Sequence, residues 1–240
     1  MLKIADKLKR VKDNIASACS RAGRDPSEIK LVVVTKSAEI AGIEEVIRLG
    51  CFDLGENRVQ QLKKVAAQVD EFLAKAPADS NLPKKILWHM IGHLQRNKVK
   101  LLLPIVSMIH SIDTLRLAEE INFEAGLLKI SPPVLLEVNT SMEPQKFGIP
   151  VGAAIHLAEQ IATLPNLKLS GIMTMAPLTK DTSVIRQCFV RARELFAEIK
   201  SEGIVGSRFN ELSMGMSSDY EIAIEEGATI LRIGSAIFTS

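Results

Sequence analysis

Cysteine is scarce in this sequence, and its spacing narrows the kinds of site that the chain can hold. There are three cysteines, Cys19, Cys51 and Cys188, and they lie far apart. None belongs to a CxxC pair, so neither a zinc site nor a disulfide framework is predicted. We expect all three to be small buried residues of a protein in a reducing compartment.

Net charge and long apolar runs are lacking as well. Lys plus Arg total 30 and Asp plus Glu total 28, so the formal net charge is only +2. A balance so close to zero predicts neither a nucleic-acid nor a membrane partner. No apolar run is long enough to cross a bilayer. Lys and Asp interrupt residues 1–22, so no signal peptide is predicted, and the expected location is cytoplasmic.

The rest of the composition is that of an ordinary globular protein. Hydrophobic residues make up 47% and charged residues 24% of the 240, which allows a sizeable core. After an amphipathic helix near the N-terminus, short apolar runs rich in β-branched residues predict strands buried on both faces. The expected strands cover residues 31–34, 52–54, 86–91, 106–112, 134–138, 167–173, 209–212 and 229–233.

Helices are predicted between successive strands. Asp113 is expected to cap the helix that begins at Thr114, and Ser218 with Glu221 has the spacing of a capping box. Alternating strands and helices imply a parallel sheet, and eight such units fit a closed (β/α)8 TIM barrel. An open doubly wound sheet is the alternative, although no GxGxxG follows the first strand. We therefore expect one domain over residues 1–240, with an extra N-terminal helix.

Lys36 is the first candidate for chemistry. Functional residues of such barrels gather where the strands end, and Thr35 and Lys36 come directly after the first predicted strand. Burial favours the neutral amine, which is the form that attacks an aldehyde. The alternative is a lysine that extends from the strand end into solvent.

Two glycine–serine segments predict a phosphate site. Residues 213–219 read SMGMSSD and follow the seventh predicted strand, while residues 232–235 read RIGS and run from the end of the eighth into the loop after it. Glycine permits close backbone approach, while hydroxyls and the free N–H groups of a helix start bind phosphate. An ordinary helix start explains either segment alone. Together they favour phosphate, because barrels often bind it after strands seven and eight.

Five sequence stretches carry a resemblance to a known family. They are residues 33–36 (VVTK), 55–58 (GENR), 88–98 (WHMIGHLQRNK), 213–219 and 232–238 (RIGSAIF). In these stretches the chain resembles the YggS/PROSC family of pyridoxal 5′-phosphate (PLP) homeostasis proteins, over nearly its whole length. That family is built like the N-terminal barrel of alanine racemase, which is PLP fold type III.

The resemblance implies a cofactor and a set of residues around it. PLP would form a Schiff base with Lys36, and Arg232 would face the pyridine nitrogen. Serines and glycines of the two loops would surround the phosphate, with Gly215 shaping its loop, while Asn57 and Met173 would line the pocket. The full implied set is Lys36, Asn57, Met173, Ser213, Gly215, Ser217, Arg232, Gly234 and Ser235.

The same set favours a binding protein over an enzyme. A cationic Arg232 disfavours protonation of the ring nitrogen, and an unprotonated ring is a weaker electron sink. Racemisation needs an acid or base on each face of the cofactor, and the single tyrosine, Tyr220, is a poor second partner for Lys36. The expected function is therefore to carry or regulate PLP in vitamin B6 and amino-acid homeostasis. The alternatives are a PLP-dependent amino-acid racemase, or a lyase or aldolase that uses Lys36 without PLP.

Other features receive weaker assignments. His89 and His93 are predicted on a strand and in the loop after it, so no metal site is assigned. A basic cluster at Arg96, Lys98 and Lys100 is a solvated face, or a docking surface for an acidic partner such as a PLP-dependent apo-enzyme. Because the racemase dimer domain is missing from the sequence, a monomer is expected.

Overall fold

Eight parallel strands form a closed barrel in this protein. The computed structural model describes residues 3–77 and 80–239. Each barrel strand pairs in parallel with both neighbours, and pairing of the fourth with the fifth completes the ring. The barrel strands are β1 (Lys30–Val34), β2 (Asp53–Glu56), β3 (Leu87–Met90), β4 (Val106–Ile112), β5 (Pro133–Asn139), β7 (Lys168–Met173), β8 (Glu211–Ser213) and β9 (Ile230–Ile233).

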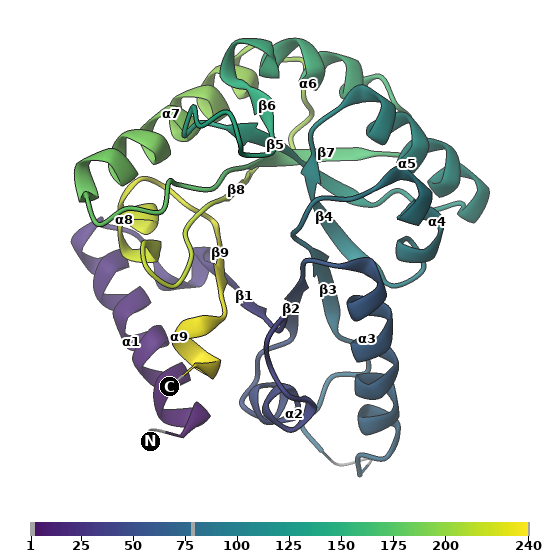
Figure 1. Cartoon of the computed structure of the whole chain (residues 1–240), viewed down its shortest axis with the longest axis vertical. Helices are drawn as coiled ribbons and strands as arrows, with labels where there is room; N and C mark the ends of the chain where they lie inside the picture. Colours follow the sequence, from purple (N-terminus) through teal and green to yellow (C-terminus); the bar gives the residue numbers. More distant parts are fainter. Residues whose placement is uncertain (1–2, 78–79, 240) are drawn as a thin grey trace.

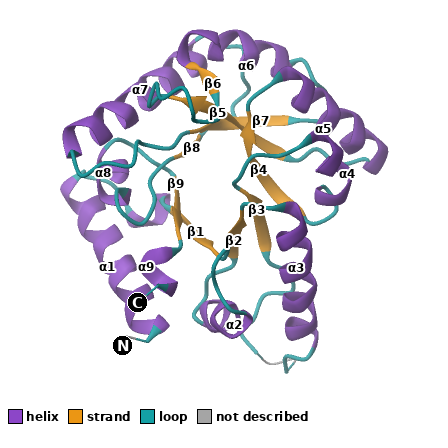
Figure 2. Ribbon diagram, viewed as in Figure 1, coloured by secondary structure: helices purple, strands orange, loops and turns teal. Residues whose placement is uncertain are grey.

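Helices surround the barrel (Figures 1 and 2). Each lies between two strands in the sequence, apart from the first and the last, which lie side by side near the two chain ends. A further short strand, β6 (Ile149–Pro150), pairs with the end of β5. The helices are α1 (Ile4–Arg21), α2 (Ile40–Arg48), α3 (Val59–Ala74), α4 (Val99–Leu102), α5 (Leu115–Leu128), α6 (Ala154–Ala162), α7 (Thr182–Ser201), α8 (Tyr220–Glu225) and α9 (Ser235–Phe238).

Two separate apolar clusters follow from the alternation of side chains along the strands. The larger one joins the outward strand residues to the helices, and includes Val33, Ile109 and Ile172. The smaller one fills the inside of the barrel, because its members come from alternate positions of five strands. Its buried residues are Val32, Met108, Leu135, Met173 and Ile230.

The predicted fold is confirmed, and the details of several element ends differ. The strand predicted over 106–112 has these bounds, whereas the strand predicted over 209–212 is shifted to 211–213. The prediction that Asp113 caps α5 is wrong, because the Thr114 hydroxyl accepts the hydrogen bond from the Leu117 N–H. The capping box of Ser218 and Glu221 is also wrong. Asp219 holds the N-cap position of α8, and its carboxylate accepts from the Met216 N–H.

The prediction that the three cysteines are buried is confirmed, since Cys19, Cys51 and Cys188 are free and buried. Burial raises the pKa of the Cys51 and Cys188 thiols, which keeps them unreactive. Across residues 3–77 and 80–239, every helix is too short or too polar to cross a lipid bilayer.

Candidate functional site

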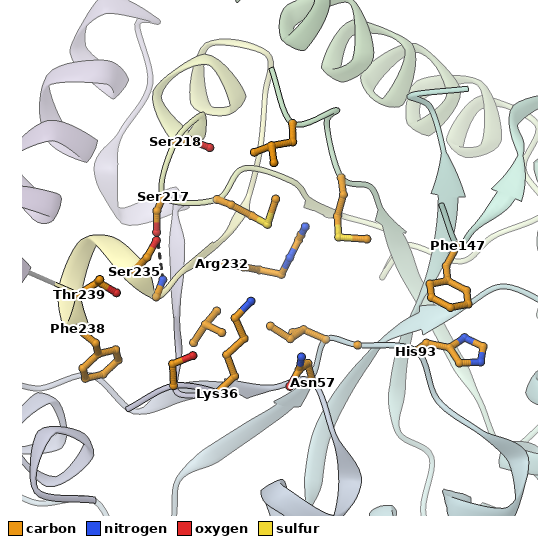
Figure 3. A pocket seen from close by; sticks show the side chains of 18 of the residues that line it. Lys36, Asn57, His93, Phe147, Ser217, Ser218, Arg232, Ser235, Phe238 and Thr239 are labelled. Carbon is orange, nitrogen blue, oxygen red and sulfur yellow. Dashed lines mark hydrogen bonds between the residues drawn. The ribbon is translucent and has the colours of Figure 1, made fainter. Parts of the chain in front are cut away.

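A cavity opens where the barrel strands end. Its volume is about 590 Å³, and its walls come from the loops after β1, β2, β3, β5, β7, β8 and β9 together with residues of β1, β5 and β9. Figure 3 shows Lys36, Arg232, Ser217 and Ser235 around one shared space. Strand ends of a parallel barrel meet at one face, and this is why residues almost 200 positions apart converge here.

Lys36 lies at the mouth of this cavity. Its side chain projects from the end of β1 towards the interior, as Figure 3 shows, yet the residue is exposed. The prediction that Lys36 is buried is therefore wrong. Beneath it, the Thr35 hydroxyl donates to the Glu56 carboxylate at 2.6 Å, and both residues are fully buried. This pair fixes the ends of β1 and β2, from which Lys36 and Asn57 extend.

Arg232 forms the floor of the cavity and is only 4% exposed. One guanidinium nitrogen donates to the Ser213 hydroxyl at 2.7 Å and the other to the Thr174 carbonyl at 2.9 Å. Burial lowers the pKa of Arg232 to about 10, against the opposing effect of the Asp219 and Glu137 carboxylates. The side chain is thus a fixed cation at neutral pH, and its remaining N–H groups are available to the cavity.

The two glycine–serine loops meet at the side of the cavity next to Lys36. The backbone N–H groups of Gly234 and Ala236 both point at the Ser217 hydroxyl oxygen, at 3.4 and 3.2 Å. A Cβ at position 234 would lie 2.8 Å from the Val34 carbonyl oxygen, so only glycine lets β9 turn this close to β1. Gly215 has a φ of +92° and lies against Tyr220 and Ala223, which explains its place in the loop before α8.

The structure brings together most of the residues in the implied set. Lys36, Asn57, Ser217, Arg232, Gly234 and Ser235 line the cavity. The loop after β3 packs directly against the backbone of Asn57. A Cβ on Gly92 would lie only 2.4 Å from the Asn57 carbonyl oxygen, so this close packing requires glycine.

Met173 and Ser213 have other places. Met173 is fully buried in the apolar cluster inside the barrel, and Met175, two residues later, lines the cavity instead. Ser213 is also fully buried, and its hydroxyl contacts Arg232 and His110 beneath the cavity floor. The resemblance implies that Ser213 contacts the phosphate and that Met173 lines the pocket. In this structure neither residue lines the cavity.

Sequence reasoning missed Glu137 and gave His93 no role, and both ionisable residues belong to the cavity wall. Glu137 is 3% exposed, and burial with the nearby Asp113 carboxylate raises its pKa to about 7. A single acidic residue within the apolar stretch PVLLEVN was the available signal. His93 stacks on Phe147 with ring centres 4.3 Å apart, and its Nδ1 lies 3.4 Å from Asp113.

Tyr220 does not belong to the cavity wall. It is 6% exposed in the first turn of α8, and its hydroxyl accepts a hydrogen bond from the Asn14 side chain of α1 at 2.9 Å. This contact holds the tyrosine on the far side of the loop that contains Ser217.

Comparison with known proteins identifies the family. The family model described as "Alanine racemase, N-terminal domain" matches residues 7–240. The chain belongs to this family. It is also 41% identical to a pyridoxal phosphate homeostasis protein of Aquifex aeolicus over 233 residues, which is 97% of this chain and 96% of the relative. The family resemblance drawn from the five sequence stretches is therefore confirmed.

Solved structures of similar proteins have the same fold. A crystal structure described as that of an unknown protein from Bifidobacterium adolescentis has a TM-score of 0.90 and 39% identity, with 98% of this chain and 94% of that chain covered. PipY of Synechococcus elongatus, in a structure with PLP bound, has a TM-score of 0.77 and 32% identity. That match covers 93% of this chain and 99% of PipY.

Proposed function

We propose that this protein binds PLP in the cavity at the ends of the barrel strands, and that it carries or regulates the cofactor in vitamin B6 and amino-acid homeostasis. The observation that carries the proposal is the convergence of an amine, a guanidinium and two backbone N–H groups on one space of about 590 Å³. PLP offers an aldehyde, a ring nitrogen and a phosphate, and each has a chemical counterpart here. The similar homeostasis protein of Aquifex aeolicus and the PLP-bound PipY support the choice of cofactor.

The phosphate fits the two loops after β8 and β9. The Gly234 and Ala236 N–H groups converge on the Ser217 hydroxyl oxygen, and an anionic oxygen would be a stronger acceptor for the same donors. The Ser217 and Ser235 hydroxyls lie beside them and add two further donors (Figure 3). Glycine at position 234 keeps the backbone within reach of a bulky anion.

Arg232 fits the ring nitrogen. Its guanidinium is held from below by Ser213 and Thr174 and remains cationic at neutral pH. PLP supplies an electrophilic aldehyde and an electron-accepting ring when bound. Because a permanent cation disfavours a proton on the adjacent nitrogen, Arg232 weakens that acceptor. This residue therefore favours storage and transfer over carbanion chemistry.

Lys36 is the residue that we assign to covalent attachment of the aldehyde carbon. Its exposed position at the cavity mouth suits reversible loading, because water and incoming ligands reach its amine directly. We also propose that residues 1–240 act as one cytoplasmic, monomeric PLP-binding unit. The basic residues Arg96, Lys98 and Lys100 lie after β3, at the same end of the barrel as the cavity. They would suit docking of an acidic surface on a recipient apo-enzyme.

A PLP-dependent amino-acid racemase is the second candidate. Glu137 and His93 favour it, because both ionisable side chains line the cavity and could exchange protons with a bound amino acid. Tyr220, the residue first considered for this role, is held outside the cavity by Asn14.

Replacement of Lys36 tests the proposal. Purified protein mixed with PLP should gain a visible absorbance band, and reduction with borohydride should fix PLP to Lys36, which peptide mass spectrometry can locate. Lys36→Ala should lose the band and the label. Lys63→Ala, an exposed lysine of α3, is the matched control and should keep both. A wild-type protein that stays colourless with PLP, or a label elsewhere than Lys36, would overturn the proposal.

A further inference from the structure

A line of hydrogen bonds runs from the cavity floor through the barrel to its opposite end. Arg232 donates to the Ser213 hydroxyl at 2.7 Å, and Ser213 lies 3.0 Å from His110 Nδ1. His110 Nε2 lies 2.9 Å from His89 Nδ1, and His89 Nε2 lies 2.9 Å from the Asp53 carboxylate. Asp53 begins β2, so this end of the line is at the start of the strands, where its side chain is 25% exposed.

Hydrogen-bond counting gives this line a single direction. The Asp53 carboxylate can only accept, and this sets the direction for two neutral imidazoles, so the Ser213 oxygen accepts from Arg232 while its own proton goes to His110 Nδ1. His110 then carries its proton on Nε2 and donates to His89 Nδ1, and His89 donates from Nε2 to Asp53. The reverse direction would place a lone pair of His89 against the Asp53 carboxylate. Every donor in the first arrangement has an acceptor, and both imidazoles are neutral.

Burial makes this arrangement rigid. His110 and Ser213 are fully buried and His89 is 2% exposed. Burial, together with His89 and Arg232, holds the pKa of His110 well below its usual range, which agrees with a neutral ring. Buried polar groups cost stability compared with apolar residues of similar shape. A continuous line of them from one end of the barrel to the other therefore points to a role for the groups at its end.

We propose that Ser213, His110, His89 and Asp53 are positioning residues that fix the orientation of the Arg232 guanidinium towards the PLP ring nitrogen. This inference rests on the proposed function. Ser213 accepts from one nitrogen of the guanidinium, and the histidines fix where the Ser213 proton points. Asp53 anchors the line by allowing only one tautomer of His89. Asp53 lies at the opposite end of the barrel from the ligand, so its influence on bound PLP passes through the other three residues.

The histidine tautomers test the line without any cofactor. The chain has four histidines, so ¹⁵N imidazole spectra of the ligand-free protein are simple to assign. We expect His89 and His110 to be neutral and to carry their protons on Nε2 at neutral pH. Asp53→Asn should let His89 exchange between tautomers, because an amide can donate as well as accept. A protonated ring, or Nδ1–H tautomers in the wild type, would overturn the inference.

The effect on the ligand is tested by Ser213→Ala with PLP bound. Loss of this acceptor should shift the absorbance band of the complex and weaken PLP binding about tenfold, as expected for one charge-assisted hydrogen bond. The control is Ser111→Ala, since Ser111 is buried on β4 and its hydroxyl makes no hydrogen bond within the described residues. Asp53→Asn should shift the band in the same direction as Ser213→Ala and by less.

The outcomes separate this inference from the proposed function. Wild-type protein that does not bind PLP would overturn both. Wild-type protein that binds PLP on Lys36, with a band that neither Ser213→Ala nor Asp53→Asn moves, would overturn the positioning role alone. If Ser213→Ala does not fold, Asp53→Asn decides, because its partly exposed site tolerates an isosteric change.

Discussion

Replacing Glu137 with glutamine should change how the stability of the protein depends on pH. This carboxylate is 3% exposed inside the barrel, and burial with the nearby Asp113 raises its pKa from 4.5 to about 7, although Arg232 opposes the shift. The folded protein therefore binds this proton more tightly than the unfolded chain. The resulting stabilisation is fully present below about pH 4.5 and is lost as the pH rises through about 7.

The size of the effect follows from the two pKa values. A difference of about 2.5 in pKa corresponds to about 3.4 kcal/mol of stability. About 2.5 kcal/mol of this should disappear between about pH 5 and about pH 8. Glutamine resembles the protonated carboxyl group and does not ionise. Relative to the wild type, Glu137→Gln should therefore become more stable by about 2.5 kcal/mol across that interval.

Urea denaturation of the ligand-free protein at several pH values measures this directly. The informative quantity is the difference in unfolding free energy between the variant and the wild type as the pH changes. Any contribution that does not change with pH, such as a difference in packing of the amide, cancels from that comparison. Glu71→Gln, at an exposed position of α3, is the control and should differ little from the wild type at any pH. A difference for Glu137→Gln that stays constant from about pH 5 to about pH 8 would refute the reasoning.

Two further predictions concern the fold and the chemistry. Gly171→Ala should destabilise the protein by several kcal/mol or prevent folding, because its Cβ would lie 1.7 Å from the Glu211 carbonyl oxygen of the neighbouring strand. Thermal unfolding checks this, with Gly206→Ala, where a Cβ meets nothing within 4 Å, as the control that should stay near wild type. The PLP-loaded protein should not racemise single L-amino acids at enzymatic rates, because racemisation needs an acid or base on each face of the cofactor and Tyr220 is held outside the cavity by Asn14. Chiral chromatography that found turnover of about 1 per second or faster would favour the racemase instead.

Local sequence patterns were sufficient for the barrel and for the positions where loops follow strands. The stretch 106–112 predicts a strand buried on both faces, and the structure has a strand with these bounds whose last five residues are buried. Lys36 and Ser235 each lie two residues after the end of their strand, so their arrival at one face follows from the topology. Helix starts were harder to predict. Asp113 and Thr114 are both good capping residues, and only the backbone conformation selects Thr114.

The barrel interior could not be predicted from neighbours in the sequence. Ser213 reaches either a phosphate or Arg232, depending on which residues of β8 face inward and how deep they lie in the barrel. The strand was predicted to begin at residue 209 and begins at residue 211, and this difference changes the depth of Ser213. The pairing of His89 with His110 joins two strands 21 residues apart. The predicted site residues follow strands, whereas Glu137 lies within one. Its position shows that the inward face of β5 also contributes to the cavity wall.

The pairing of β1 with β9 has a consequence for how the site is made. Lys36 follows β1, and the loop of Gly234 and Ser235 follows β9, so the two halves of the cavity are separated by almost the whole chain. A ribosome releases Lys36 long before β9 exists, and the cavity has no phosphate wall until the ring closes. PLP can then bind only the finished barrel, and the free energy of binding stabilises the whole fold over any partly folded form.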